Sequence, residues 1–140
     1  MVFGAFDVFH KGHLNFFQQA RRLAKNPFLV VSVARDVNVK IIKGQNPMFS
    51  EQQRLRGVRS CPLVDKAVLG GFKNYIPHIA KEKPAIIALG YDQKAYTKNL
   101  KKVLNKENLD IKVVRLRAFK PQVYKSSLTK RILGYSTFVL

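Results

Sequence analysis

Short apolar runs alternate with helix-like segments along this chain of 140 residues. A run that is apolar at nearly every position is typical of a strand buried on both faces, as in a parallel sheet. Parallel strands need long crossover connections, and helices between the runs supply them. The expected strands cover residues 1–3, 28–33, 63–69, 84–89 and 111–116, and the expected helices cover 12–25, 51–61, 74–82, 95–106 and a last segment that begins at Ser126.

Five strands alternating with helices predict an α/β protein with a Rossmann-like, doubly wound parallel sheet in the order 3-2-1-4-5. The length suits one domain, residues 1–140, with a core of its own. Residues 34–49 read as a polar connection with turn residues, and Ser50 and Gln53 form a capping-box pattern at the start of the next helix. Ligands of such sheets bind beyond the carboxyl ends of the strands, where strands 1 and 4 are neighbours.

The chain is strongly basic: 26 lysines and arginines against 8 acidic residues give a formal net charge of +18. Such an excess attracts anions, including nucleotides, phosphorylated substrates and nucleic acid. No apolar run approaches the roughly 18 residues that span a bilayer, and no signal peptide opens the chain. Cys61 is the single cysteine and is expected in the core. We expect a soluble cytoplasmic protein without an intrachain disulfide or a membrane contact.

A candidate phosphate site lies where the first strand turns into the first helix. The N–H groups at a helix start are unpaired and carry a partial positive charge, which favours anions. His10, Lys11 and His13 stand at this turn, with Gly12 between the last two. A lone histidine here would be an ordinary cap or surface residue, whereas the pair predicts a triphosphate site. The turn after strand 4, Gly90 to Gln93, would line the same crevice.

A second helix start has similar chemistry, because Ser126 and Ser127 follow Lys125 directly. Two hydroxyls and a lysine at a helix N-terminus suit a phosphate, although an ordinary N-cap would have the same residues.

The stretch Gly4-Ala5-Phe6-Asp7, followed by His10-Lys11-Gly12-His13, resembles the signature of the nucleotidyltransferase superfamily of cytidylyltransferases and related adenylyltransferases. That signature is Gly-Thr-Phe-Asp followed by His-x-Gly-His, so Ala5 stands in place of the usual threonine. The resemblance covers nearly the whole chain. Its further blocks are Asp36, Lys43-Gly44, Pro47-Met48, Glu51 with Arg54, Val64-Asp65, Gly90-Tyr91-Asp92 and Lys125-Ser126-Ser127.

Within the superfamily, the chain most resembles the archaeal FAD synthases, which transfer AMP from ATP to FMN. Three blocks carry this finer resemblance: residues 64–70, residues 88–93, and residues 119–121 with 124–127. Two features depart from the pattern. The C-terminal cysteines of many members are missing, and the arginine expected before the Ser126 element has no clear equivalent, Lys120 being the nearest cation.

The resemblance implies roles for named residues. His10, His13 and Lys43 would be catalytic, with the histidines donating hydrogen bonds to the triphosphate and Lys43 reaching it from a mobile loop. Mg²⁺ would be bound mainly by the phosphates of ATP or CTP, with no certain protein ligand. Nucleotide binding is implied for Ala5, Phe6, Gly12, Asp92, Tyr124, Ser126 and Ser127, and supporting roles are implied for Asp7, which would orient the loop or help position Mg²⁺, and for Arg54 and Lys125.

Alternatives stay open at this point. The acceptor could be glycerol 3-phosphate with CTP, or a sugar phosphate of the heptose type with ATP, in place of the favoured FMN. Outside enzymes, the charge of +18 would suit a nucleic-acid-binding module. The lysines show no interleaved aromatic platform and no recognised binding motif, which counts against that alternative. Relatives are often homodimers, but no feature of the sequence locates an interface.

Overall fold

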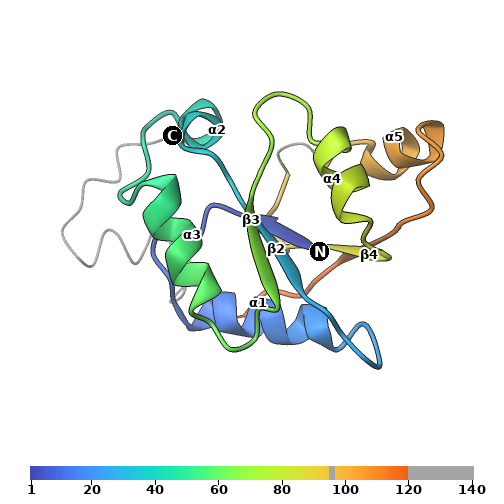
Figure 1. Cartoon of the computed structure of the whole chain (residues 1–140), viewed down its shortest axis with the longest axis horizontal. Coiled ribbons are helices and arrows are strands. Elements are labelled where there is room, and N and C mark those ends of the chain that lie inside the picture. The colour runs from blue at the N-terminus through green and yellow to red at the C-terminus, as the bar shows by residue number, and fades with distance from the viewer. Residues whose placement is uncertain (95–96, 120–140) are drawn as a thin grey trace.

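The fold was analysed in a computed structural model, which describes residues 1–94 and 97–119. Its centre is a five-stranded parallel sheet in the order β3-β2-β1-β4-β5, which confirms the predicted fold class and strand order (Figure 1). The strands are short and lie within the predicted runs or one residue from them. They are β1 Val2–Gly4, β2 Val30–Val33, β3 Lys66–Leu69, β4 Ile86–Leu89 and β5 Lys112–Arg115.

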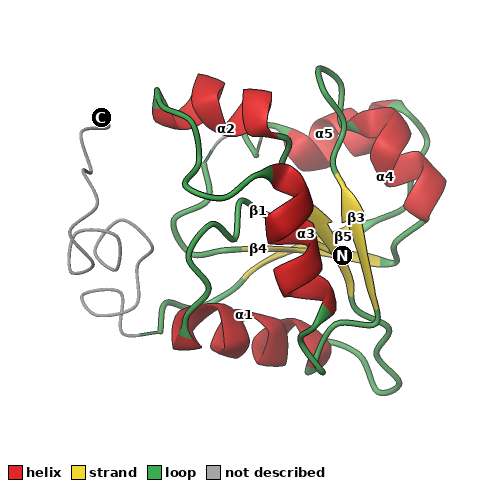
Figure 2. Ribbon diagram, turned by 60° about the vertical axis from the view of Figure 1, so that its left-hand side comes forward, coloured by secondary structure: helices red, strands yellow, loops and turns green. Residues whose placement is uncertain are grey.

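Helices cover both faces of the sheet (Figure 2). Helices α1 (Lys11–Arg21) and α3 (Glu51–Arg59) share one buried cluster with β2, and helices α4 (Ile76–Glu82) and α5 (Leu100–Lys106) share a second cluster with β4. The first cluster is centred on Phe17, Val31 and Val58, the second on Ile79, Ile87 and Leu104.

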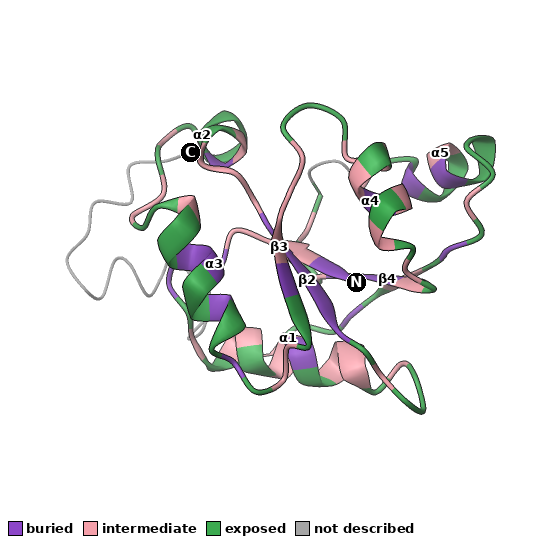
Figure 3. Cartoon of the chain, in the orientation of Figure 1, coloured by how far each residue is buried: buried purple, intermediate pink, exposed green. Residues whose placement is uncertain are grey.

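Strand β2 is buried along its whole length, as its continuous apolar run predicts (Figure 3). Val31 and Val33 face the cluster under α1 and α3. The side chain of Ser32 is buried as well, and its Oγ lies 2.8 Å from Nε2 of His78 on α4. A buried hydroxyl needs such a partner, so this bond ties α4 to the sheet.

The largest error of the sequence prediction is helix α2, Asp36–Lys43, which forms where a polar connection was expected. The helix ends at Gly44, whose φ of 80° is left-handed and whose N–H donates to the carbonyl of Lys40. Glycine reaches this conformation without steric cost, so residue 44 is a good helix terminator. Helix α2 therefore stands at the carboxyl edge of the sheet, beside the candidate site (Figure 1).

Two other predicted helices are shorter in the structure. The first ends at Arg21 rather than at Lys25, because the chain tightens into turns before Pro27 returns it to β2. Helix α5 begins at Leu100 rather than at residue 95, after Asn99 in the left-handed conformation. The predicted last helix, from Ser126, lies outside the described residues. No helix within residues 1–94 and 97–119 has the length and apolarity to cross a membrane.

Candidate active site

The turn between β1 and α1 is held by a close contact between Gly4 and Phe6. Phe6 has a left-handed φ of 52°, which folds its ring back over Gly4; a Cβ atom on Gly4 would lie 2.7 Å from Cζ of that ring. The buried ring then packs edge-on against the imidazole of His13, with centroids 5.3 Å apart. The side chain of Phe6, a residue predicted to bind nucleotide, thus supports the ring of His13.

His10 and His13 cap the start of α1 reciprocally. Nδ1 of His10 accepts a hydrogen bond from the backbone N–H of Gly12 (3.0 Å), and Nδ1 of His13 accepts one from the N–H of His10 (3.2 Å). A neutral imidazole has one acceptor nitrogen and one N–H. Because both Nδ1 atoms accept, the proton of each neutral ring is assigned to Nε2.

The surroundings keep both histidines neutral. Burial lowers the pKa of His13 to about 3, and the positive charges of His10 and Lys43 act in the same direction. Burial also lowers the pKa of His10. At neutral pH the two rings therefore donate hydrogen bonds without carrying charge of their own.

Lys43 lies close enough to the histidines for its charge to act on His13. It is the last residue of α2 and is exposed, so it belongs to a helix end and not to the loop from which it was predicted to act. The positive charge of Lys43 thus lies near the histidine pair, at the C-terminal end of helix α2.

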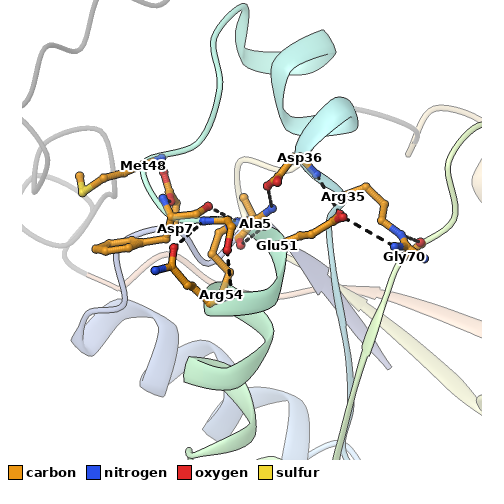
Figure 4. A network of polar contacts seen from close by, with 11 residues as sticks. Ala5, Asp7, Arg35, Asp36, Met48, Glu51, Arg54 and Gly70 are labelled. Atoms are coloured by element: carbon orange, nitrogen blue, oxygen red, sulfur yellow. Dashed lines mark hydrogen bonds and ion pairs between the residues drawn. The ribbon is translucent and has the colours of Figure 1, made fainter.

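The carboxylate of Asp7 is used within the protein. Its two oxygens accept hydrogen bonds from the backbone N–H groups of Met48 (2.7 Å) and Phe49 (2.9 Å), and the residue is only 3% exposed (Figure 4). Of the two roles predicted for Asp7, the structure therefore supports orientation of a loop. The carboxylate ties the β1–α1 turn to the segment between α2 and α3.

Arg54 is the buried centre of the same network (Figure 4). Its side chain is fully buried, and each guanidinium nitrogen has a partner: Nε donates to the carbonyl of Phe49 (3.0 Å), Nη1 to that of Ala5 (2.8 Å) and Nη2 to the carboxylate of Asp36 (2.7 Å). Ala5, predicted to bind nucleotide, has its carbonyl committed to this contact. Arg54 thereby links the turn between β1 and α1, the start of α2 and the segment before α3.

The turn after β4 meets the end of β1, as the switch-point argument predicts. The side-chain amide of Gln93 accepts from the N–H of Gly90 (3.1 Å) and donates to the carbonyl of Phe3 (3.3 Å). Asp92 lies exposed on this turn. Arg115, at the end of β5, donates to the carbonyl of Gly90 (2.8 Å) and holds the turn from the other side.

A hollow of about 470 Å³ lies beside this turn, between the ends of β4 and β5 and the start of α5. Its lining combines Leu89, Leu100 and Val113 with Thr97 and Arg115. The sequence did not identify Thr97 and Arg115 as lining residues of this hollow. Their positions follow from the sheet order and not from any local motif.

Other predicted residues lie outside the described part of the chain. They are Lys120, Tyr124, Lys125, Ser126 and Ser127. Within residues 1–94 and 97–119 no group of three or more His, Cys, Asp or Glu side chains could hold a metal ion.

The chain belongs to the cytidylyltransferase-like family, whose model matches residues 1–133. The class of enzyme that the fold and the match define is a nucleotidyltransferase.

Proteins similar in sequence to this chain include FAD synthases from archaea. The chain is 41% identical over 132 residues to the FAD synthase of Archaeoglobus profundus, covering 93% of this chain and 83% of the relative. It is 44% identical over 121 residues to the FAD synthase of Methanothermus fervidus, covering 86% and 83%. Among solved structures, a lipopolysaccharide core biosynthesis protein from Thermoplasma volcanium matches with a TM-score of 0.80 and 35% identity, covering 86% of this chain and 96% of that one.

Proposed function

We propose that this protein is an ATP:FMN adenylyltransferase, which joins AMP to FMN and releases pyrophosphate. The observation that carries the proposal is the similarity to archaeal FAD synthases at 40–44% identity over most of the chain. The geometry of the β1–α1 turn supports it, because two neutral imidazole donors and Lys43 suit a polyphosphate.

In the proposed reaction, a phosphate oxygen of FMN attacks the α-phosphorus of ATP in line. The new bond joins that oxygen to the α-phosphorus, while the bond from the α-phosphorus to the bridging oxygen breaks and pyrophosphate leaves with the electron pair. FMN phosphate is already an anion, so the attack needs no general base. The protein aligns two anions and stabilises the charge that develops on the leaving group.

His10 and His13 would supply Nε2–H groups to the triphosphate, since their Nδ1 atoms are occupied. Lys43 would add a positive charge from the end of α2. Tyr124, Lys125, Ser126 and Ser127 keep the roles that the resemblance implies, binding the nucleotide and its outer phosphates. Asp92 would contact the ribose or the metal ion from the β4 turn.

Mg²⁺ would enter with the nucleotide. Asp7, the acidic residue at the β1–α1 turn, accepts a backbone N–H at each oxygen, so we assign this carboxylate the loop-orienting role of the two that were predicted. When bound, the ion would neutralise phosphate charge, and the chemistry assigned to the protein's own residues is hydrogen bonding and alignment.

A second candidate is a sugar-phosphate adenylyltransferase. It is favoured by the structural similarity to the lipopolysaccharide core biosynthesis protein from Thermoplasma volcanium. The same phosphate site would serve either acceptor.

The deciding experiment pairs each donor with each acceptor. The purified protein is incubated with ATP or CTP, together with FMN, glycerol 3-phosphate or a heptose phosphate, and pyrophosphate and the nucleotide products are resolved by chromatography. FAD formed in equal amount to pyrophosphate from ATP and FMN alone is the expected result. A sugar nucleotide as the main product would show that the acceptor is the sugar phosphate and not FMN. CDP-glycerol as the main product would show that it is glycerol 3-phosphate. Tight, salt-sensitive nucleic-acid binding without any transfer would favour the binding-module alternative.

A further inference from the structure

Phe72 is a large aromatic side chain that the protein leaves 60% exposed. It lies in the loop between β3 and α4, next to the end of β2. The guanidinium carbon of Arg35 lies over its ring, 4.3 Å from the centroid. A phenyl ring with one face on a guanidinium and much of its surface in solvent has the form of a stacking platform.

Polar contacts hold Arg35 and the base of the Phe72 loop in place. Nε of Arg35 donates to the carbonyl of Gly70 (2.9 Å), and its Nη1 lies 3.8 Å from a carboxylate oxygen of Glu51 (Figure 4). The side-chain amide of Asn38 on α2 donates to the carbonyl of Gly71 (2.7 Å). These contacts fix the base of the Phe72 loop against α2, so a ligand that stacks there spends little free energy on ordering the loop.

Exposed apolar side chains gather at the same edge of the sheet. Val37 and Ile41, one helical turn apart on α2, are 48% and 67% exposed. Of the large exposed apolar residues in the described ranges, Phe28 alone precedes a strand, and the others follow strand ends, lie on α1 and α2 or, in the case of Phe49, lie in the segment between α2 and α3. Apolar surface concentrated on one edge of so basic a protein is a mark of ligand binding.

The strand order gives the distance that the ligand must bridge. The catalytic turn follows β1, and the Phe72 loop follows β3, two places away in the sheet. At the usual spacing of parallel strands the two loops are about 10 Å apart. Helix α2 connects the two loops, because Arg35 occupies the N-cap position at its start and Lys43, near His13, is its last residue. A ligand that occupies both places has a phosphate at one end, a flat aromatic ring at the other and a chain between them.

From these observations we infer that Phe72, backed by Arg35, is the specificity-determining platform on which the isoalloxazine ring of FMN stacks. The inference rests on the proposed function and deepens it, because it assigns the acceptor ring to the β2–β3 side of the crevice. The ribityl chain would run along α2, and the FMN phosphate would reach the histidine turn. Glycerol 3-phosphate has no ring to place on Phe72, so the platform discriminates between the acceptors.

The test compares Phe72→Ala with Phe28→Ala, a matched control in which a phenylalanine of similar exposure (68% against 60%) is removed from the opposite edge of the sheet. Removal of a stacking side chain costs a ligand on the order of tenfold in affinity. We expect Phe72→Ala to raise the KM for FMN by about tenfold and to leave the KM for ATP and kcat at saturating FMN close to wild type. Phe28→Ala should leave all three constants unchanged.

Direct binding is measured with FMN alone by isothermal titration calorimetry. Phe72→Trp should retain the affinity for FMN, whereas Phe72→Leu, which keeps an apolar side chain without a ring, should lose it. An FMN affinity of Phe72→Ala equal to that of Phe28→Ala would overturn the platform while leaving FAD synthesis intact. A wild-type protein that forms no FAD would overturn the proposed function itself, so the two failures are distinguishable.

Discussion

The imidazole rings of His10 and His13 are stacked, with centroids 3.9 Å apart and planes 17° from parallel. Each ring accepts a backbone N–H through Nδ1, and these two bonds shape the first turn of α1. Protonation of either Nδ1 would remove its acceptor and place a charge beside its neighbour. The stack therefore depends on both rings being neutral.

Acid should weaken the fold through His13. Its pKa is about 3 in the folded protein and 6.5 without the fold, so the unfolded chain binds more protons between these values. The contribution to stability is fully present above the unfolded value and is lost as the pH falls towards 3. We expect the free energy of unfolding, measured with urea, to fall more steeply from about pH 7 to about pH 5 in the wild type than in His13→Asn, which cannot titrate. Equal slopes would contradict this account of His13.

Replacement of His10 should separate capping from catalysis. His10→Ala removes a donor to the transition state and a helix cap, so kcat should fall by about a hundredfold and stability by about 1 kcal/mol. Asparagine is a good N-cap, so His10→Asn should recover the stability but not the rate. The check is steady-state kinetics beside thermal unfolding. A near-normal kcat in a folded His10→Ala protein would remove His10 from the catalytic group.

Lys43→Ala should weaken the use of ATP. Hydrogen bonds to charged groups are worth about 1.5–3 kcal/mol, so we expect the KM for ATP to rise by about tenfold or more. Lys40→Ala is the matched control, because Lys40 is exposed on the same helix. Both variants are assayed at ATP concentrations below the KM. Similar rates for the two variants would show that Lys43 contributes only to the general positive charge.

Arg54→Met should destabilise the protein and slow catalysis together. The substitution leaves two carbonyls and the Asp36 carboxylate without their shared donor, and a polar group left without its partner costs about 1–3 kcal/mol. Arg56→Met, on the exposed side of the same helix, should have little effect. Urea unfolding and kcat measured on both variants test this. An Arg54→Met protein as stable as Arg56→Met would show that the network can be replaced by packing.

Two glycine substitutions should have opposite effects. A Cβ on Gly4 would collide with the Phe6 ring, so Gly4→Ala should cost about 1–3 kcal/mol and lower kcat by displacing the support of His13. At Gly57, inside α3, a Cβ meets no atom within 4 Å, and alanine is the better helix former. Gly57→Ala should therefore stabilise the fold by about 0.5–1 kcal/mol. Thermal unfolding of both variants measures the difference, and a stable, active Gly4→Ala protein would contradict the tight-turn account.

The sheet and the position of the two histidines were predictable because their signals are local. Continuous apolar runs indicated the strands, and the sequence placed His10 and His13 at a strand-to-helix junction, where the structure has them. Helix α2 escaped prediction because only Val39 among its apolar residues is buried, while Val37, Ile41 and Ile42 point to solvent. A helix with most of its apolar residues exposed lacks the single buried stripe that identifies helices in a sequence.

Contacts between distant residues could not be read from the sequence. The resemblance implied a supporting role for Arg54 but not its contacts: the side chain is fully buried, and its partner Ala5 is 49 residues away. Arg35 and Phe72 are likewise joined by the sheet order alone. A sequence motif identifies side chains with reactive or ligand-binding chemistry. The side chains that hold them in place are brought together by the topology of the fold.

The reciprocal cap at the start of α1 has a consequence for redesign of this enzyme. The same two nitrogen atoms that hold the backbone also decide which nitrogen carries the proton. Any residue that replaces a histidine must therefore both terminate a helix and present a donor in the opposite direction, and few side chains have two such opposed functions. We expect libraries randomised at position 10 or 13 to return inactive proteins even where they fold, and new chemistry on this scaffold to be reached more readily through the acceptor side.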